Sequence, residues 1–459
     1  MSKRNSTRRR FLLGGSLAAG GLGLRAMATG LPAWFLADPL RASADDLACA
    51  ADAADKLQFL IVSASSAGDS VSCNCPGTYD DDAIIHPSQD EFAAADFSFG
   101  TQTVKAAQIW TTLSDAVRGR SNFFHHITGG TVHGDHPAVM RFLGRSSGGE
   151  MWPSIYAKHL APCLGTVQAE PVAVGANGNA LEFLSYSGRT LPTVAPMQLK
   201  QLLTGSARDP LVGLRPLRDQ TLSDLNTLLK EDGTAAQRAF LDAMAASQTQ
   251  VRQLSESLAS TLTAIGDDRV QGQALAAAAL IAAKVTPVVT LHVPFGGDNH
   301  EDGDLYDEWF DHTDHDSSKR GVAGIQAIAD ALADLDLTDK VTFATMNVFG
   351  RDLSGTPKVQ GRSGRDHFGN HSVMFMFGKN VAPGVTGGTT EISGGVFGAA
   401  DIDSSSGGKL ASGGDIARAD THVAAAKTLG VALGIDPGAL DADFTDAGAI
   451  PYVKASVVG

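Results

Sequence analysis

The chain has 459 residues, 43% of them hydrophobic, and 50 acidic side chains outnumber 36 basic ones, for a net charge of −14. This composition is typical of a globular protein with a sizeable core, and so acidic a chain argues against nucleic acid or an anionic membrane as a partner. The length exceeds that of a typical single domain and suits one large α/β domain with an insertion, or one domain plus a helical lobe.

The first 44 residues have the layout of an export signal. Arg8 and Arg9 precede a Gly- and Ala-rich apolar segment, which ends in a small-residue cleavage pattern. This layout predicts a twin-arginine signal peptide over 1–44, leaving 45–459 as the mature domain. Arg25 interrupts the apolar run, which argues against a membrane anchor. We therefore expect a periplasmic or secreted protein with no stable membrane insertion after cleavage.

The first half of the mature chain alternates between strand and helix patterns. A continuous apolar run at 57–63 predicts a strand that is buried on both faces. Residues 103–120 carry apolar side chains at near-helical spacing and predict a helix, and 122–128 predict the next strand. Residues 217–284 lack proline and are rich in Ala, Leu, Gln and Ser, so they predict two or three helices that form an insertion.

The second half returns to strand patterns. Apolar runs predict strands at 285–293 and 372–377, and an amphipathic helix is predicted over 322–335 between them. The alternation along the whole chain predicts an α/β fold in three layers, with helices on both faces of a mostly parallel sheet.

The four cysteines leave disulfide pairing open. Outside the cytoplasm they could pair in three ways. Cys73 and Cys75 are two residues apart, which is a poor spacing for a relaxed disulfide. The sequence has no second closely spaced Cys pair, so a structural zinc site is not expected here. A disulfide that involves Cys163 is neither favoured nor excluded, and the same holds for Cys49.

Acidic and histidine side chains gather where two predicted strands meet their loops. Ligands in parallel α/β sheets bind beyond the carboxyl ends of the strands. Asp298 and His300 follow one strand and point the same way if the chain stays extended, while Asp366 and His367 open the segment that leads into another. Carboxylate plus imidazole suits zinc or manganese better than calcium. These four residues are therefore candidate ligands of one divalent ion, or alternatively only cap and bridge loops.

Other residues are candidates for catalysis or binding. His133 and His136 stand at the start of a short predicted helix, where an anionic group is favoured. Arg365, like Arg351, could contact an oxyanion through bidentate bonds, or could pair with a nearby Asp. The acidic run at 304–318 could bind a cation, but such runs are typical of solvated loops.

Four motifs, in chain order, resemble those of the bacterial exported proteins grouped as "domain of unknown function 1501". They are SSAGDS at 65–70, DNH at 298–300, NVFGR at 347–351 and, most specific, GRDH at 364–367. That family belongs to the alkaline phosphatase/sulfatase-like superfamily. The resemblance therefore implies a sheet of that type with one or two metal ions at the carboxyl ends of its strands, and hydrolysis of small-molecule or cell-envelope phosphate or sulfate esters.

The resemblance also assigns roles to single residues. It implies that Asp298 and His300 bind the first metal and that His367 completes that site. Asp366 would be a ligand or would orient one, and Arg365 would contact an oxyanion.

Two departures from the superfamily pattern bear on activity. Val348 and Phe349 stand where active members have an Asp-His pair of metal ligands. No Ser, Thr or Cys lies between His133 and Arg145, where the nucleophile would be, and Thr131 is just outside. These departures imply a single metal ion and leave two functions open: a metal-dependent ester hydrolase, or a catalytically degenerate member that binds a ligand or a cell-envelope partner.

Overall fold

The computed structural model describes most of the mature chain, namely residues 56–100, 102–166, 168–175, 184–204, 215–231, 233, 238, 241, 256–353, 364–444 and 450–458. The predicted signal over 1–44 and Cys49 lie outside these residues. Within the described ranges, no helix combines the length and apolar character needed to cross a bilayer.

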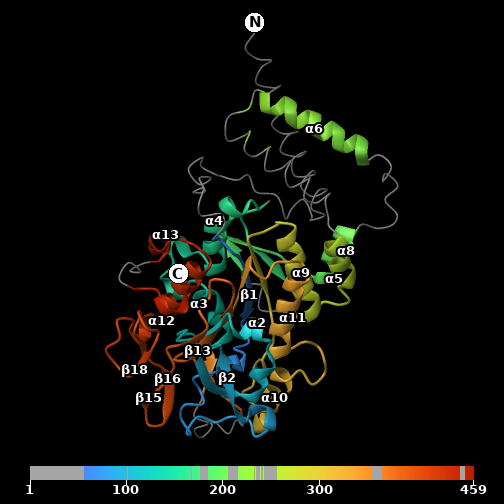
Figure 1. Cartoon of the computed structure of the whole chain (residues 1–459). Coiled ribbons are helices and arrows are strands. Elements are labelled where there is room, and N and C mark those ends of the chain that lie inside the picture. The colour runs from blue at the N-terminus through green and yellow to red at the C-terminus, as the bar shows by residue number, and fades with distance from the viewer. Residues whose placement is uncertain are drawn as a thin grey trace.

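An eight-stranded sheet forms the centre of the molecule, in the order β14-β4-β13-β10-β1-β9-β5-β8 (Figure 1). In that order the strands span Gly384–Thr386, Ser121–His126, Ser372–Phe377, Val341–Asn347, Phe59–Ser65, Val288–Leu291, Val172–Val174 and Thr193–Val194. Neighbouring strands are parallel except around β13, which runs antiparallel to both β10 and β4. The prediction of a mostly parallel sheet is confirmed.

Helices cover both faces of the sheet because its strands are apolar on both sides. The helices that pack on its two faces are α4 (Trp152–Leu164), α9 (Val270–Ala282), α11 (Gly321–Ala333) and α12 (Thr421–Ala432). Phe59 and Ile61 of β1 share one apolar cluster with α9 and α11, whereas Leu60 and Val62 share another with α4 and α12. Figure 1 shows these two pairs of helices on opposite sides of the sheet. The fold is therefore mixed α/β.

Further helices and small sheets surround this centre. The other helices are α2 (Asp115–Arg118), α3 (His136–Val139), α5 (Pro196–Thr204), α6 (Arg215–Glu231), α8 (Glu256–Ala264), α10 (Tyr306–His312) and α13 (Pro437–Asp443). Five two-stranded sheets pair β2 (Ala94–Phe99) with β3 (Gln102–Ala107), β6 (Ser185–Tyr186) with β7 (Arg189–Thr190), β11 (Gly350–Arg351) with β12 (His367–Phe368), β15 (Thr389–Ser393) with β16 (Val396–Ala399), and β17 (Asp401–Ile402) with β18 (Lys409–Leu410). Described parts of the segment 217–284 are helical, and α9 within it packs against β9.

The helix predicted over 103–120 is wrong. Its first part is β3, which pairs antiparallel with β2, and only Asp115–Arg118 form an α-helix. Phe97 lies directly opposite Val104, so an aromatic and a β-branched side chain form a cross-strand pair. Such pairs stabilise a hairpin, and a few apolar residues at helical spacing do not outweigh them.

The described cysteines are in two states. Cys163 is disulfide-bonded, whereas Cys73 and Cys75 are buried free thiols.

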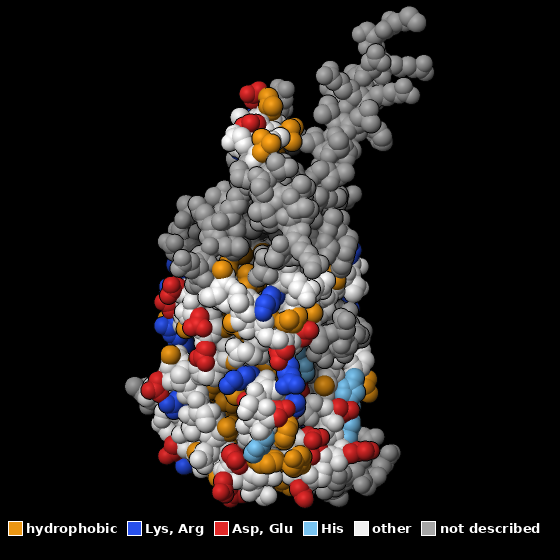
Figure 2. Space-filling view, turned by 90° about the vertical axis from the view of Figure 1, so that its right-hand side faces the viewer, with side chains coloured by type: hydrophobic (Ala, Val, Ile, Leu, Met, Phe, Trp, Pro, Cys, Tyr) orange, Lys and Arg blue, Asp and Glu red, His pale blue; other side chains and the backbone are white. Residues whose placement is uncertain are grey.

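The surface charge is mixed. On the face shown in Figure 2, the described Asp, Glu, Lys and Arg side chains are scattered and form no large basic patch.

The loops that matter for function meet at one edge of the sheet. β1, β4, β9 and β10 all end at this edge, and β13 begins there because it runs in the opposite direction. The segment that carries His367 is thereby brought next to the loops that follow β4 and β9.

Candidate metal centre

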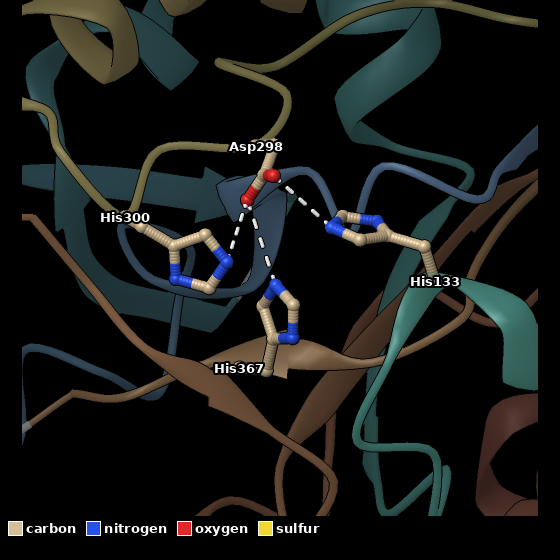
Figure 3. A group of neighbouring side chains, drawn as sticks. All are labelled: His133, Asp298, His300 and His367. Atoms are coloured by element: carbon tan, nitrogen blue, oxygen red, sulfur yellow. Dashed lines mark hydrogen bonds and ion pairs between the residues drawn. The ribbon is translucent and has the colours of Figure 1, made fainter.

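Four side chains converge at this edge (Figure 3). His133 follows β4, Asp298 and His300 follow β9, and His367 begins β12. One ligand atom from each lies within 4.8 Å of those of the other three. Three imidazoles and one carboxylate form a donor set that suits zinc and related divalent metals. These four residues could therefore hold one metal ion.

The carboxylate of Asp298 stands at the centre of the group. His133 Nε2 is 3.1 Å from Asp298 Oδ2, and His300 Nε2 is 3.0 Å from Asp298 Oδ1. His367 Nε2 lies 3.5 Å from the same Oδ1 atom. All three rings thus turn the same nitrogen, Nε2, toward one carboxylate.

Backbone carbonyls fix the tautomers of two of these rings. His133 Nδ1 is 2.7 Å from the carbonyl oxygen of Ser66, and His367 Nδ1 is 2.8 Å from that of Thr131. A carbonyl can only accept a hydrogen bond, so each Nδ1 carries the proton and donates it. In the neutral ring, Nε2 then presents its lone pair to Asp298. A metal-binding histidine is usually held in this way, with its other ring nitrogen bonded to a carbonyl or carboxylate.

The surroundings of His367 are compatible with a cation in the group. Burial, with Arg351, His300 and His133 acting in the same direction, lowers the pKa of His367 to about 4. The hydrogen bond to Thr131 raises this pKa but does not outweigh them. The ring is therefore neutral at pH 7, and its buried Nε2 makes no hydrogen bond within the described residues. A lone pair that faces a carboxylate oxygen is repelled by it, and a metal ion between the two atoms would turn this repulsion into two favourable contacts.

Asp366, predicted as a possible ligand, lies on the outer side of His300. Its Oδ1 atom is 3.5 Å from His300 Nδ1, the ring nitrogen that faces away from Asp298. This is the place of a carboxylate that orients a metal-binding histidine. Asp366 therefore lies next to the group but is not one of its four possible ligands, and His133 is the fourth instead.

Arg351 holds the central carboxylate in its ionised form. Its Nη2 is 3.2 Å from Asp298 Oδ1. Partial burial raises the pKa of Asp298, but Arg351, together with His300 and His133, lowers it below the ordinary value. The buried Arg351 guanidinium, including Nη2, also donates to the carbonyl oxygens of four residues, Ala67, Gly68, Gly297 and Arg365. Of the two roles considered for Arg351, the geometry matches pairing with an aspartate.

Two of the catalytic candidates lie elsewhere. Arg365 is buried and forms an ion pair with Glu308, with 2.9 Å between Arg365 Nε and Glu308 Oε2. Burial raises the pKa of Glu308, but Arg365 lowers it below the ordinary value, so both groups are charged. His136 is buried at the start of α3, where burial and the nearby charge of His292 lower its pKa to about 4. The structure does not bring Arg365 or His136 into the group at Asp298.

Two further carboxylates fix the loop that carries Asp298. Asp69 Oδ1 accepts hydrogen bonds from the backbone N–H groups of Phe295 and Gly297, at 3.2 and 2.9 Å. Its other oxygen is 2.9 Å from His292 Nε2, and although burial raises the pKa of Asp69, this pairing lowers it to about 2. Asp311 Oδ2 accepts from Gly296 N at 3.2 Å. Three successive N–H groups are thus held by carboxylates, which presets the position of the next residue, Asp298.

The acidic run at 304–318 is more ordered than a solvated loop. It contains α10 and the fully buried Glu308. Arg320 forms ion pairs with Asp311 and Asp316. Three of the six acidic side chains in the run, Glu308, Asp311 and Asp316, are therefore paired with an arginine of the protein itself.

Apolar side chains occupy the positions that correspond, by resemblance, to the ligands of a second metal. Val348 and Phe349 are both buried, and the Phe349 ring stacks on the His367 ring with 4.0 Å between centroids. Gly68 has a φ of +67°, and a Cβ there would come within 1.9 Å of the Phe349 ring. Within the described residues, the group at Asp298 is the only cluster of three or more His, Cys, Asp or Glu side chains with metal-binding geometry.

The sequence placed His133 among catalytic candidates, and its position as a possible ligand was missed. A usable signal was the Gly129-Gly130 pair just before it. A Cβ on Gly130 would lie 2.4 Å from the carbonyl oxygen of Val348, so only glycine lets this loop pass so close to the end of β10. That close approach brings His133 to Asp298.

Comparison with protein families supports one of the sequence expectations. Residues 184–401 match the family described as "Protein of unknown function (DUF1501)". The match supports the family expected from the motifs and includes three of the four, those at 298–300, 347–351 and 364–367. No curated protein matches the chain with significance.

Proposed function

We propose that this protein binds one divalent transition-metal ion through His133, Asp298, His300 and His367. The observation that carries the proposal is the orientation of the three rings, all with Nε2 toward one ionised carboxylate. In His133 and His367, Nδ1 is hydrogen-bonded to a backbone carbonyl, and in His300 it lies 3.5 Å from Asp366 Oδ1. Three nitrogens and one oxygen match the tetrahedral preference of zinc. Manganese is the second choice, and the hard, oxygen-seeking calcium ion is the poorest match.

We further propose that this centre hydrolyses phosphate or sulfate esters, in a fold of the alkaline phosphatase-like type exported by the twin-arginine pathway. The motif order, the mostly parallel sheet and the metal-binding group at the carboxyl edge support this activity. The side chains of His133 and Asp298 are 40% and 45% exposed, so a small-molecule or cell-envelope ester can reach that side of the group. A bound zinc ion would supply Lewis-acid polarisation of the ester oxygen and a more acidic water.

The protein's own residues would have limited roles in such a reaction. Asp298, kept ionised by Arg351, and the three histidines would hold the ion. Ser66 and Thr131 border the group but contribute their backbone carbonyls to His133 and His367. Water is therefore the expected nucleophile, rather than a side-chain hydroxyl.

A second candidate is a non-catalytic protein in which the metal organises this edge of the sheet for binding a ligand or a cell-envelope partner. The observation that favours it is the number of ligands, because four protein ligands fill a tetrahedral zinc site, whereas catalytic zinc usually keeps one position for water. The engagement of Arg351 with four carbonyls points the same way, since it leaves that guanidinium committed to the protein.

Metal analysis combined with an ester panel tests these proposals. We expect about one equivalent of metal in the mature protein purified from the periplasm, and none in Asp298→Ala. Chromogenic phosphate and sulfate esters are then tested with the zinc and manganese forms. Turnover by the parent that Asp298→Ala abolishes supports the hydrolase, whereas bound metal without turnover supports the second candidate. A parent without metal contradicts both.

A further inference from the structure

Behind the metal-binding group, Glu308 of α10 lies at the middle of a buried polar network. Its side chain is 0% exposed. Its Oε2 atom accepts hydrogen bonds from Asn299 Nδ2 at 3.2 Å and from Arg365 Nε at 2.9 Å. Its Oε1 atom accepts from Asn74 Nδ2 and, at 3.4 Å, from Arg365 Nη2. One carboxylate thus has four hydrogen-bond donors from three parts of the chain.

Two of the three residues that donate to Glu308 belong to the segments that carry the proposed metal-binding residues. Asn299 lies between Asp298 and His300, and its side chain turns away from theirs to reach Glu308. Arg365 stands two residues before His367 in the other segment. Glu308 therefore holds both segments from the side opposite to the metal-binding atoms.

The two segments are also pressed together directly. Gly364 N donates to the carbonyl oxygen of His300 at 2.8 Å. A Cβ on Gly364 would lie 1.7 Å from the carbonyl oxygen of Asn299, so only glycine permits the contact. Arg365 also donates to the carbonyl oxygens of Asp352, at 2.9 Å, and Ile85, at 2.6 Å, which ties this contact to the surrounding scaffold.

We propose that Glu308 is a positioning residue of the metal centre. By binding Asn299 and Arg365 at once, it sets the separation between the Asp298–His300 pair and His367 before a metal arrives. This inference rests on the proposed metal site. A metal ion requires its ligands at fixed distances, so ligands that are already in place bind without the cost of ordering two loops.

The competing explanation is a buried ion pair that stabilises the fold and has no bearing on the metal. The two explanations differ in what they predict for the folded, metal-free protein. A pair that only stabilises the fold affects unfolding and leaves the metal affinity of the folded state unchanged. A positioning residue affects metal affinity and ligand geometry even where the protein stays folded.

The test uses the mature protein with Glu308→Gln and the milder Asn299→Ala, which keeps the Glu308–Arg365 pair. Zinc affinity is measured by competition with a chromophoric chelator, and the visible spectrum of the cobalt(II) form reports ligand geometry. We expect each variant to bind zinc about 10- to 100-fold more weakly, the usual effect of losing a residue that orients metal ligands. We also expect an altered cobalt(II) spectrum.

Lys427→Met is the control, because the buried Lys427 forms an ion pair with the partly exposed Asp441 in another part of the fold. It should lower stability toward urea and leave zinc affinity unchanged. The inference is overturned if Asn299→Ala is folded and binds zinc within twofold of the parent. This criterion also decides the test if the Glu308→Gln protein fails to fold. A parent that binds no zinc or cobalt overturns the proposed metal site as well. A parent that binds metal but hydrolyses no ester leaves the inference standing.

Discussion

His367 and His371 lie four residues apart in one glycine-containing segment, yet they have opposite surroundings. His367 faces the ionised Asp298 and a side of the group that is open to solvent. His371 is fully buried, and its Nε2 is 3.0 Å from Nδ1 of His125, whose other nitrogen lies 2.8 Å from the carbonyl oxygen of Pro76. The two rings form a neutral, structural contact, in which the buried Nδ1 of His371 makes no hydrogen bond within the described residues.

The comparison shows that histidines at a strand end do not define a site by themselves. What distinguishes the proposed metal-binding group is a carboxylate kept ionised by Arg351 and a ring nitrogen whose lone pair is directed at it. In the His125–His371 pair, a proton on one ring fills the space between the two nitrogens, and within the described residues no carboxylate completes a ligand set with them. The predictions below test this difference.

The largest expected effect is the loss of metal from His367→Asn. Removing one of four ligands should lower zinc affinity by at least about 100-fold, beyond the usual effect of changing a residue outside the ligand set. The purified protein should then carry no stoichiometric metal by elemental analysis. Glu301→Gln removes an exposed charge next to His300 and should keep the full metal content. A His367→Asn protein with one equivalent of metal would show that the ion binds elsewhere.

The next effect is a loss of stability in acid that comes from the buried histidines. Burial lowers the pKa of His125 and of His126 to about 4 and that of His371 well below its usual value. The unfolded chain takes up these protons near pH 6.5 and the folded chain does not. Stability should therefore be constant above about pH 6.5 and fall below it by about 1.4 kcal/mol per pH unit for each such histidine, down to about pH 4.

Urea unfolding of the metal-free protein at pH 7.5, 6 and 5 measures this dependence. The metal is removed first so that protonation of its ligands does not contribute. A urea midpoint that is the same at all three values would mean that these histidines are protonated in the folded state.

A smaller effect is expected for His371→Asn. The substitution leaves His125 Nδ1 without its partner and should lower the free energy of unfolding by about 1–3 kcal/mol. Zinc affinity should stay within a few-fold of the parent, the reverse of the result for His367→Asn. Urea unfolding and chelator competition on both proteins provide the comparison. If His371→Asn also lost its metal, the two histidines would belong to one functional unit.

The smallest effect concerns the contact between His300 and Asp366. Asp366→Asn should weaken zinc binding by roughly tenfold, because the amide orients the imidazole less strongly than a carboxylate does. Chelator competition measures the change. A loss as large as that of His367→Asn would make Asp366 a ligand, as the sequence first suggested.

Continuous apolar runs were the most reliable guide to the fold. The strand predicted at 372–377 forms with the same bounds, and the run at 57–63 becomes β1, shifted by two residues. Both are buried on two faces, so no other arrangement satisfies their side chains. The segment 103–120 was mispredicted because its first part forms a strand by pairing with β2. The spacing of apolar residues within 103–120 does not reveal that partner.

The metal-binding group was predictable only in part. Asp298, His300 and His367 could be placed because strand direction and chain order bring their segments to one edge. His133 was assigned another role because its distance from Asp298 depends on a close approach at Gly130. The place of Arg365 depends on a buried partner 57 residues away, Glu308, in a run whose composition resembles a solvated loop.

The position of β13 in the sheet affects how the metal centre is made. β13 lies between β4 and β10 but follows both in the chain, so a growing polypeptide keeps a gap in its sheet until this strand emerges. His367 arrives just ahead of the strand that closes the gap. A chain that stops before this point has an incomplete sheet and an incomplete ligand set together. In the proposed route, where proteins cross the membrane already folded, bound metal would therefore mark the molecules whose sheet is closed.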